Sequence, residues 1–299
     1  MLIRQGRVVV DDMPVPIPGP GEVLVRTAHS VISAGTELAS IEGSATREPV
    51  SRWLNRLRKA GEVAALALDR GVTETRSAVA ARLEGPSVAC GYSLAGRVER
   101  VGRDVTDLVA GQRVACAGAS SAVHAEYVAV PRNLVAVVPD GLDSPSAAFA
   151  TLGAIAMHGV RQADVRLGEF VAVVGCGLIG QLTVALLHAA GCRVLASDLD
   201  AARVERASAL GIERGIVAGR EEFARAVNQA TGGRGADAVI LTAATPSSEP
   251  IRQAVDALRR RGRVVVVGAV GMEIERAPFY HKEVELRIAC SYGPGRHDP

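Results

Sequence analysis

Hydrophobic and polar positions follow two different patterns along the chain. Up to about residue 142, short alternating runs such as Glu22–Thr27 (EVLVRT) are separated by glycine, proline and aspartate, as in β-strands joined by loops. Further strands of this kind are expected at 95–101, 112–116 and 125–130. After residue 143, continuous apolar runs alternate with helix-like segments. We therefore predict a mainly β domain over residues 1–142 and an α/β domain over residues 143–299.

The apolar runs of the second domain predict a parallel sheet. Strands are expected at 169–174, 192–197, 214–217, 237–242, 262–268 and 284–289. Their nearly continuous valine, isoleucine and leucine content is typical of strands that are covered on both faces. The linking segments include helix-like patterns at 181–191 (QLTVALLHAAG) and 249–262 (EPIRQAVDALRRRG). The predicted fold class is α/β, with a doubly wound sheet after the β domain.

A helical insert is expected to interrupt the β domain at about residues 46–85. Trp53 and Leu57 lie four positions apart and form an apolar stripe, and Thr73 is a suitable N-cap for a second helix. Residues 45–85 hold eight basic and five acidic side chains, a net charge of +3. These basic residues have two possible interpretations. They form a solvated polar face of the insert, or the insert is a lid that presents positive charge to an anionic substrate.

Composition narrows the classes of partner. The 34 basic and 32 acidic side chains leave a net charge of +2, and nine aromatic residues are few for base stacking, so no nucleic-acid partner is expected. Phe170–Cys192 carries no formal charge over 23 residues, but its spaced glycines favour a strand, a turn and a buried helix over a membrane span. The five cysteines form no CxxC pair, which favours reduced thiols in a cytoplasmic protein.

A glycine-rich turn provides the clearest functional motif. Gly175-Cys176-Gly177-Leu178-Ile179-Gly180 follows a predicted strand and precedes a predicted helix. In this context Gly175 permits the tight turn, Gly177 lets the backbone approach a pyrophosphate, and Gly180 lets the helix pack on the strand. The pattern indicates a Rossmann dinucleotide-binding site.

An acidic residue, Asp198, directly follows the next predicted strand, 192–197. Asp198, 18 residues after Gly180, can accept hydrogen bonds from both ribose hydroxyls and would repel a 2′-phosphate, so NAD(H) is preferred over NADP(H). Arg203 is expected near the adenosine. Further cofactor-binding positions are expected at Leu178, Ile179, Thr242 and Gly268.

Several segments together resemble the medium-chain dehydrogenase/reductase superfamily. They are PxPGPGEVLVR near the start, AAFATLGAIAMHGV at the domain junction and YHKEVELRIACSYG near the end. The resemblance covers nearly the whole chain. It implies a GroES-like catalytic domain followed by a Rossmann NAD-binding domain, and alcohol dehydrogenase-like chemistry on a CH–OH group. It also implies a return segment after the last strand, which we expect the Rossmann domain at 143–299 to lack.

The chain departs from the zinc-using members at each expected ligand position. Ala34-Gly35-Thr36-Glu37 replaces a CGTD-like segment, Tyr92 and Ser93 replace the His and Glu of GHExxG, and Thr151 stands at the third ligand position. Alanine, tyrosine and threonine are not ligands that Zn²⁺ uses in such sites. We therefore expect no zinc and no metal-binding residues.

Four residues are candidates for proton handling without the metal. Thr36 matches the hydroxyl that relays a proton in zinc-using relatives, and the phenol of Tyr92 could donate to a substrate carbonyl. His124 matches a position that borders the cleft in relatives, and Glu37 would orient its neighbours. Alternatively, Tyr92 fills the volume of a lost metal site and His124 is structural. By the same resemblance, Tyr292 and Thr151 are expected at the nicotinamide.

The leading hypothesis is a zinc-independent NAD(H) oxidoreductase that acts on a hydroxyl or carbonyl of a polar, sugar-derived or anionic small molecule. VISAGTE, HAEYVAVP and CSYGPGRHDP are most similar to a zinc-less subgroup, several members of which are the front half of two-part oxidoreductases. A segment related to VISAGTE, ISTGTE, occurs in the dehydrogenase of bacteriochlorophyll synthesis. Resemblance to that second subgroup is therefore an alternative. The alternatives are a quinone or enone reductase, and a dinucleotide-binding module without catalysis of its own. A homo-oligomer, or a partner or fused C-terminal module, is expected.

Overall fold

A computed structural model describes residues 1–4, 7–33, 35–38, 41 and 88–296. The predicted helical insert at 46–85, with Trp53, Leu57 and Thr73, lies outside the described residues. The chain divides into two compact units, Met1–Ala148 and Phe149–Pro299, and each is described by itself.

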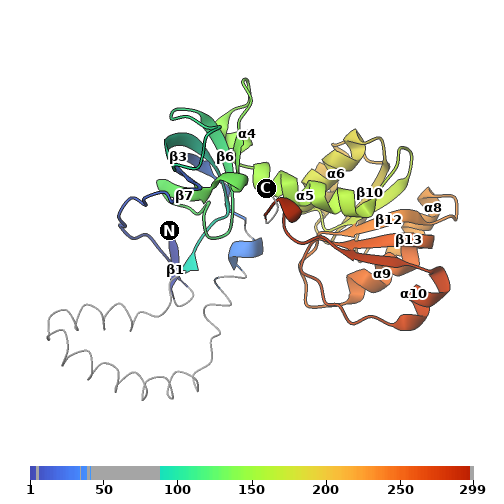
Figure 1. The fold of residues 1–299 in the computed structure, drawn as a ribbon. Coiled ribbons are helices and arrows are strands. Elements are labelled where there is room, and N and C mark those ends of the chain that lie inside the picture. Colours follow the sequence, from blue (N-terminus) through green and yellow to red (C-terminus); the bar gives the residue numbers. More distant parts are fainter. Residues whose placement is uncertain (5–6, 34, 39–40, 42–87, 297–299) are drawn as a thin grey trace, which may run out of the picture. The chain divides into compact units, whose positions relative to one another are not determined.

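The first unit is built on antiparallel sheets (Figure 1). Its five-stranded sheet has the order β7-β3-β5-β6-β8, and a small sheet has the order β2-β1-β4. The strands are β1 (Leu2–Arg4), β2 (Arg7–Val9), β3 (Glu22–Ser30), β4 (Val88–Ala89), β5 (Ser93–Val101), β6 (Arg113–Ala117), β7 (Tyr127–Pro131) and β8 (Val135–Val137). A 3₁₀ turn, η1, spans Arg132–Leu134 and a short helix, α4, spans Ser144–Ala147. This is the GroES-like β domain that the sequence predicts.

The boundary between the units falls after Ala148 and not after residue 142. Helix α4 begins at Ser144, and the carboxylate of Asp143 caps it by accepting the Ser146 N–H at 2.8 Å. The buried hydroxyl of Ser93 in β5 donates to the Ala148 carbonyl oxygen at 2.6 Å. These contacts attach the segment after residue 142 to the first unit.

The second unit contains one six-stranded parallel sheet of order β11-β10-β9-β12-β13-β14. Its strands are β9 (Phe170–Val174), β10 (Arg193–Asp198), β11 (Arg214–Val217), β12 (Ala236–Leu241), β13 (Leu258–Val266) and β14 (Glu285–Ile288). The order reverses between β9 and β12, as in a doubly wound sheet with a crevice at the carboxyl ends of the strands. The fold class predicted from the sequence is confirmed.

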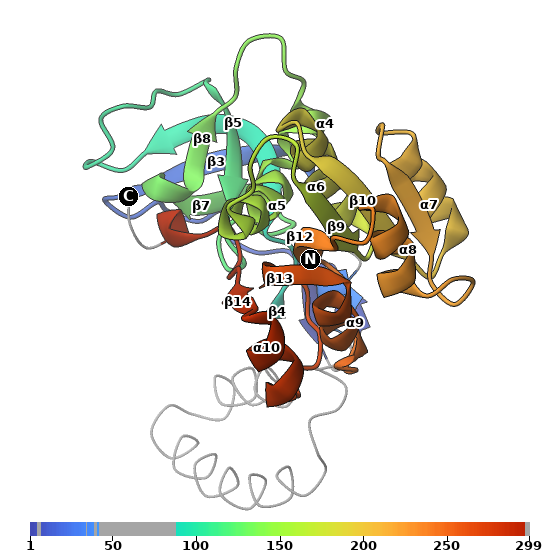
Figure 2. The ribbon, with the colours of Figure 1, turned by 90° about the vertical axis from the view of Figure 1, so that its right-hand side faces the viewer.

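Helices cover both faces of this sheet, as Figure 2 shows. The helices are α5 (Ala150–Ala163), α6 (Leu178–Ala189), α7 (Ala201–Ser208), α8 (Phe223–Ala230), α9 (Glu249–Ala257) and α10 (Arg276–Lys282), and a 3₁₀ turn, η2, spans Pro294–Arg296. Within β9, Val171 packs in the cluster that includes residues of α5 and α6, whereas Ala172 packs in the cluster that includes residues of α8 and α9. Alternation between two buried faces explains why the central strands β9 and β12 contain hardly any polar positions.

Two sequence patterns have a different length in the structure. The helix-like pattern 249–262 ends at Ala257, and Leu258 already belongs to β13. The Lys282 ammonium donates to the carbonyl oxygens of Val255, Asp256 and Leu258, each at 2.8 Å, and so satisfies the acceptors at the end of α9. The long apolar run 170–192 divides into β9, the glycine turn and α6. Among the described residues, no helix is both long and apolar enough to cross a bilayer.

Candidate active site

The glycine turn follows β9 and leads into α6, and its three glycines have different surroundings. Gly175 has φ +98°, and a Cβ there would lie 2.7 Å from the backbone nitrogen of Ala243. At Gly180 a Cβ would lie 1.9 Å from the Gly175 carbonyl oxygen. At Gly177, apart from its two chain neighbours, no described residue has an atom within 4 Å of the Cβ position. Two glycines are therefore required by packing, whereas the third leaves open space beside the backbone.

The open space lies at the N-terminus of α6. Gly177 is the N-cap and, having no side chain, leaves the first N–H groups of the helix without a side-chain cap. Leu178 and Ile179 form the first turn. Unpaired N–H groups and the positive end of the helix dipole favour a phosphate at such a position. The geometry fits the pyrophosphate of a dinucleotide.

Asp198 is fixed at the end of β10 by its own backbone contacts. One carboxylate oxygen accepts the Cys176 N–H at 2.7 Å, and the other accepts the Asp200 N–H at 2.9 Å. The Asp198 side chain is 9% exposed, and the Arg203 guanidinium lies 3.8 Å from it. Burial and the nearby Asp198 carboxylate raise the pKa of the Cys176 thiol to about 12, so the thiol stays neutral. Asp198 therefore presents a fixed negative charge beside the glycine turn.

The neighbouring strand ends pack closely against this turn. The Thr242 hydroxyl, directly after β12, donates to the Gly175 carbonyl oxygen at 2.5 Å. After β13, a Cβ at Gly268 would lie 2.1 Å from the Ala243 carbonyl oxygen. The carboxyl edge thus brings together Gly175, Asp198, Thr242 and Gly268, and their contact with a cofactor stays a prediction.

Two further predicted cofactor residues lie elsewhere in the second unit. Tyr292 is half-buried and follows β14 and Ser291, whose φ is +52°. Thr151 is buried in the first turn of α5, with 3% of the residue exposed. Both stay predicted cofactor-binding residues.

The first unit brings two of the four catalytic candidates into direct contact. The His124 Nε2 lies 3.0 Å from the Glu37 Oε1, and the His124 Nδ1 lies 2.8 Å from the Ser30 Oγ. The side chains of His124 and Glu37 are 7% and 11% exposed, whereas Ser30 is exposed. Sequence reasoning missed Ser30, because a serine at the end of an alternating strand carries no motif.

The position of the His124 ring depends on a glycine and on backbone contacts. Gly91 has φ +94°, and a Cβ there would lie 2.9 Å from the ring. The His124 N–H donates to the Cys90 carbonyl oxygen at 2.7 Å, and the Met1 ammonium donates to the His124 carbonyl oxygen at 2.8 Å. Burial and the Glu37 carboxylate raise the pKa of the Cys90 thiol. The ring, the carboxylate and a neutral thiol thus form one compact cluster.

Thr36 and Tyr92 stand beside this cluster. Thr36 is exposed, and its hydroxyl lies 3.4 Å from the Ser33 hydroxyl. The Ser33 N–H donates to the Glu37 Oε1 at 3.1 Å. Tyr92 is half-buried and directly follows Gly91. The structure therefore places all four candidates in the first unit and brings the side chains of His124 and Glu37 into direct contact.

The residues do not fit a zinc site of the superfamily type. Its ligand positions hold Ala34, Tyr92 and Thr151, and of these Ala34 lies outside the described residues. Within the described part of the chain, no three His, Cys, Asp or Glu side chains gather closely enough to hold a metal ion. A tyrosine and a buried threonine do not replace the thiolate and imidazole ligands that Zn²⁺ requires.

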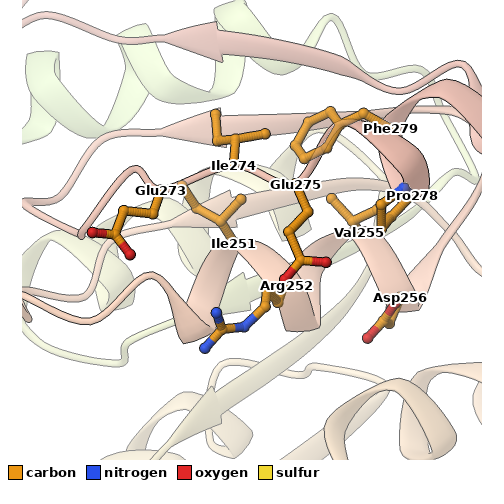
Figure 3. Close-up of a pocket in the computed structure, with 9 residues that line it drawn as sticks. All are labelled: Ile251, Arg252, Val255, Asp256, Glu273, Ile274, Glu275, Pro278 and Phe279. Carbon is orange, nitrogen blue, oxygen red and sulfur yellow. The ribbon is translucent and has the colours of Figure 1, made fainter.

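A separate cavity of about 200 Å³ lies between α9 and α10. Figure 3 shows the apolar side chains of Ile251, Val255, Ile274 and Phe279 gathered on one side, with carboxylates toward the rim. None of the predicted site residues lines it. The cavity is therefore distinct from the glycine turn and from the His124 cluster.

Comparisons with known proteins agree with both units. The model of the zinc-binding dehydrogenase family matches residues 179–298, and the model of the alcohol dehydrogenase GroES-like domain matches residues 62–140. An alcohol dehydrogenase of Moraxella sp. (strain TAE123) is 26% identical over 87% of this chain and 73% of its own length. The L-galactonate-5-dehydrogenase of Escherichia coli (strain K12) is 31% identical over 64% of each chain. The crystal structure of galactitol-1-phosphate dehydrogenase from Escherichia coli superimposes with a TM-score of 0.76 at 18% identity, covering 97% of this chain and 82% of that one.

Proposed function

The chain belongs to the medium-chain dehydrogenase/reductase superfamily, and on that premise we propose that it is a zinc-independent, NAD(H)-dependent oxidoreductase. It acts on a hydroxyl or carbonyl group of a polar small molecule. The observation that carries the proposal is the Asp198 carboxylate, held by two backbone N–H groups at the edge of the open glycine turn.

Residues of the second unit would hold the dinucleotide. The N-terminus of α6 at Gly177 would receive the pyrophosphate, and Asp198 would accept hydrogen bonds from the ribose hydroxyls. Thr242, Gly268, Tyr292 and Thr151 would contribute to the nicotinamide side. When bound, the nicotinamide supplies the acceptor or donor of a hydride. The negative charge of Asp198 disfavours a 2′-phosphate, which supports NAD(H) over NADP(H) despite the exposed Arg203 guanidinium nearby.

The residues of the first unit would handle the proton without a metal. Tyr92 and Thr36 carry hydroxyls that can donate to a developing alkoxide, which replaces the role of a Lewis acid. His124 and Glu37 form a buried acid–base pair beside them. Elemental analysis of the purified protein tests the metal-free assignment: zinc below about 0.1 atom per chain is expected, and one tightly bound zinc per chain would overturn it.

The substrate class is inferred from the sugar-acid relative. The related L-galactonate-5-dehydrogenase is named for an anionic, polyhydroxylated substrate. We therefore place sugar alcohols, aldonates and sugar phosphates first. The net charge of +3 on residues 45–85 is compatible with an anionic group.

The direct test is a substrate screen that follows NADH absorbance with these compounds. On any hit, Tyr92→Phe and Thr36→Val are expected to reduce kcat by a factor on the order of 10²–10⁴, the usual contribution of a positioned proton donor. Full activity in both variants would discard this assignment. Turnover restricted to C=C acceptors with NADPH would instead indicate an enone or quinone reductase.

We also propose that the protein is cytoplasmic and that it associates with another chain or module. All five cysteines are free and four are buried, which is compatible with a reducing, cytoplasmic setting. We expect a homo-oligomer or association with a second module. Light scattering coupled to size-exclusion chromatography tests the first, and a monomer at micromolar concentration would exclude a stable homo-oligomer.

A further inference from the structure

An exposed hydroxyl, a buried imidazole and a buried carboxylate lie in series in the first unit. The Ser30 Oγ lies 2.8 Å from the His124 Nδ1, and the His124 Nε2 lies 3.0 Å from the Glu37 Oε1. The exposed member is Ser30, and the carboxylate lies at the opposite end. Both ring nitrogens are occupied, so the imidazole can exchange a proton with a substrate only through one of its two partners.

The position of Ser30 connects this series to the proposed reaction. Strand β3 pairs with β5 so that Ser30 lies opposite Leu94, two residues after Tyr92. The next residue, Val31, donates its N–H to the Ser93 carbonyl oxygen at 3.0 Å. Ser30 therefore stands beside the segment that replaces the metal-binding GHExxG motif of the superfamily.

We propose that Ser30 is the catalytic hydroxyl that passes the substrate proton to His124, the base behind it, while Tyr92 and Thr36 donate hydrogen bonds to the developing alkoxide. Glu37 is the positioning carboxylate. The proposal rests on the proposed function, because alcohol oxidation must release the hydroxyl proton. It adds a residue that no sequence motif indicates.

The transfer balances without a further reactant. In the oxidation direction, the substrate O–H bond breaks as a new bond forms to the Ser30 Oγ, and the original Ser30 proton moves to the His124 Nδ1. The resulting imidazolium keeps its Nε2–H toward the ionised Glu37. After product leaves, the Nδ1 proton returns through Ser30 to water, so one proton passes to solvent and the tautomer is restored.

Charged and titratable groups from three other segments lie next to His124. The charged groups recorded next to His124 in the described residues are the Glu37 carboxylate and the Met1 ammonium. The Cys90 thiol has a raised pKa and is neutral near pH 7. The carboxylate is held in place by the Ser33 N–H.

The test uses four variants of the full-length protein. Ser30→Ala and His124→Gln are expected to reduce kcat by a factor on the order of 10²–10⁴, to flatten the pH profile of kcat and to leave NADH binding unchanged. Ser30→Thr retains the hydroxyl and should stay within about tenfold of the wild type. His29→Gln, on the exposed neighbour of Ser30, is the matched control. Equal kcat values in Ser30→Ala and the wild type would overturn the proposal.

A second measurement decides the assignment independently of turnover. With ¹⁵N-histidine labelling, the ring-nitrogen signals of His124 show by NMR which nitrogen carries the proton, in the wild type and in Glu37→Gln, with His29 as the internal reference. The wild type should carry the proton on Nε2, toward Glu37, and the His124 signals should shift in Glu37→Gln while those of His29 stay unchanged. His124 signals that are the same in both proteins refute the series even if no substrate is found. NADH binding without turnover on any compound refutes the proposed function instead.

Discussion

The Asp198 carboxylate accepts the backbone N–H of Cys176 at 2.7 Å, which joins the end of β10 to the glycine turn after β9. Because its other oxygen accepts the Asp200 N–H, the carboxylate cannot rotate away from the turn. A preorganised charge of this kind selects between cofactors more sharply than a mobile one. The first prediction follows from this contact.

Asp198→Asn is expected to change cofactor preference. The amide can still accept a backbone N–H, but it no longer repels a 2′-phosphate, and Arg203 becomes available to attract one. The ratio of the Kd values for NADPH and NADH should fall at least about tenfold, roughly 1.4 kcal/mol. Fluorescence titration with both cofactors measures it. Asp200→Asn is the matched control, because asparagine caps α7 as well as aspartate does, and a ratio altered equally in both variants would contradict the assignment.

Two glycines of the same turn should respond differently to alanine. At Gly177 a methyl group meets no atom of the described residues within 4 Å, its two chain neighbours apart, so the free energy of unfolding should change by less than about 1 kcal/mol. NADH binding should nevertheless weaken at least about tenfold, because the methyl group occupies the space beside the helix N-terminus. Calorimetric titration and urea unfolding together measure both effects. Unchanged NADH affinity in Gly177→Ala would place the pyrophosphate elsewhere.

Gly180→Ala, in contrast to Gly177→Ala, is expected to lower the stability of the protein. Its Cβ would lie 1.9 Å from the Gly175 carbonyl oxygen, so α6 must move away from β9. We expect a loss of about 1–3 kcal/mol in the free energy of unfolding, the usual cost of overpacking. Urea denaturation measures the loss. A variant as stable as the wild type would show that α6 can shift without cost.

Gly91→Ala should disturb the His124 ring. A left-handed φ costs an L-residue about 1–2 kcal/mol, and the Cβ would also lie 2.9 Å from the imidazole. Gly111→Ala separates the two effects, because Gly111 has φ +88° and open space around its Cβ position. The difference in unfolding free energy between these variants reports the clash. The His124 ring signals should shift in Gly91→Ala only, and equal spectra would show that the ring tolerates the methyl group.

Thiol labelling should be selective and depend on pH. Burial raises the pKa of Cys116 to about 12, and burial together with Asp198 does the same for Cys176. A raised pKa keeps the thiol protonated below that pH, and the protonated form is not the nucleophile. Iodoacetamide at pH 8 should therefore modify the exposed Cys290 first. Peptide mass spectrometry measures the order, and early modification of Cys116 would contradict its burial.

Much of the architecture follows from local sequence patterns. The alternation at 22–27 and the continuous apolar runs after residue 169 identify the strands, because burial on one face or two faces determines which positions can be polar. The Gly175–Gly180 turn identifies the dinucleotide site for a similar reason, since only glycine permits those backbone conformations and approaches. The residue types at Tyr92 and Thr151, read through the family resemblance, also predict that the chain binds no zinc.

Contacts between distant segments were decided only by the tertiary structure. Ser30 and His124 are 94 positions apart, and His124 and Glu37 are 87 positions apart. Lys282 ends α9 from 24 or more positions away, which is why a helical pattern up to residue 262 stops at Ala257. These contacts depend on strand register and on how elements pack, and neither propensity nor periodicity encodes them. The sequence by itself therefore determined the strands and the glycine turn and predicts the absence of zinc ligands, while the Ser30–His124–Glu37 series became visible only when β3, the segment around Glu37 and the segment before β7 were brought together.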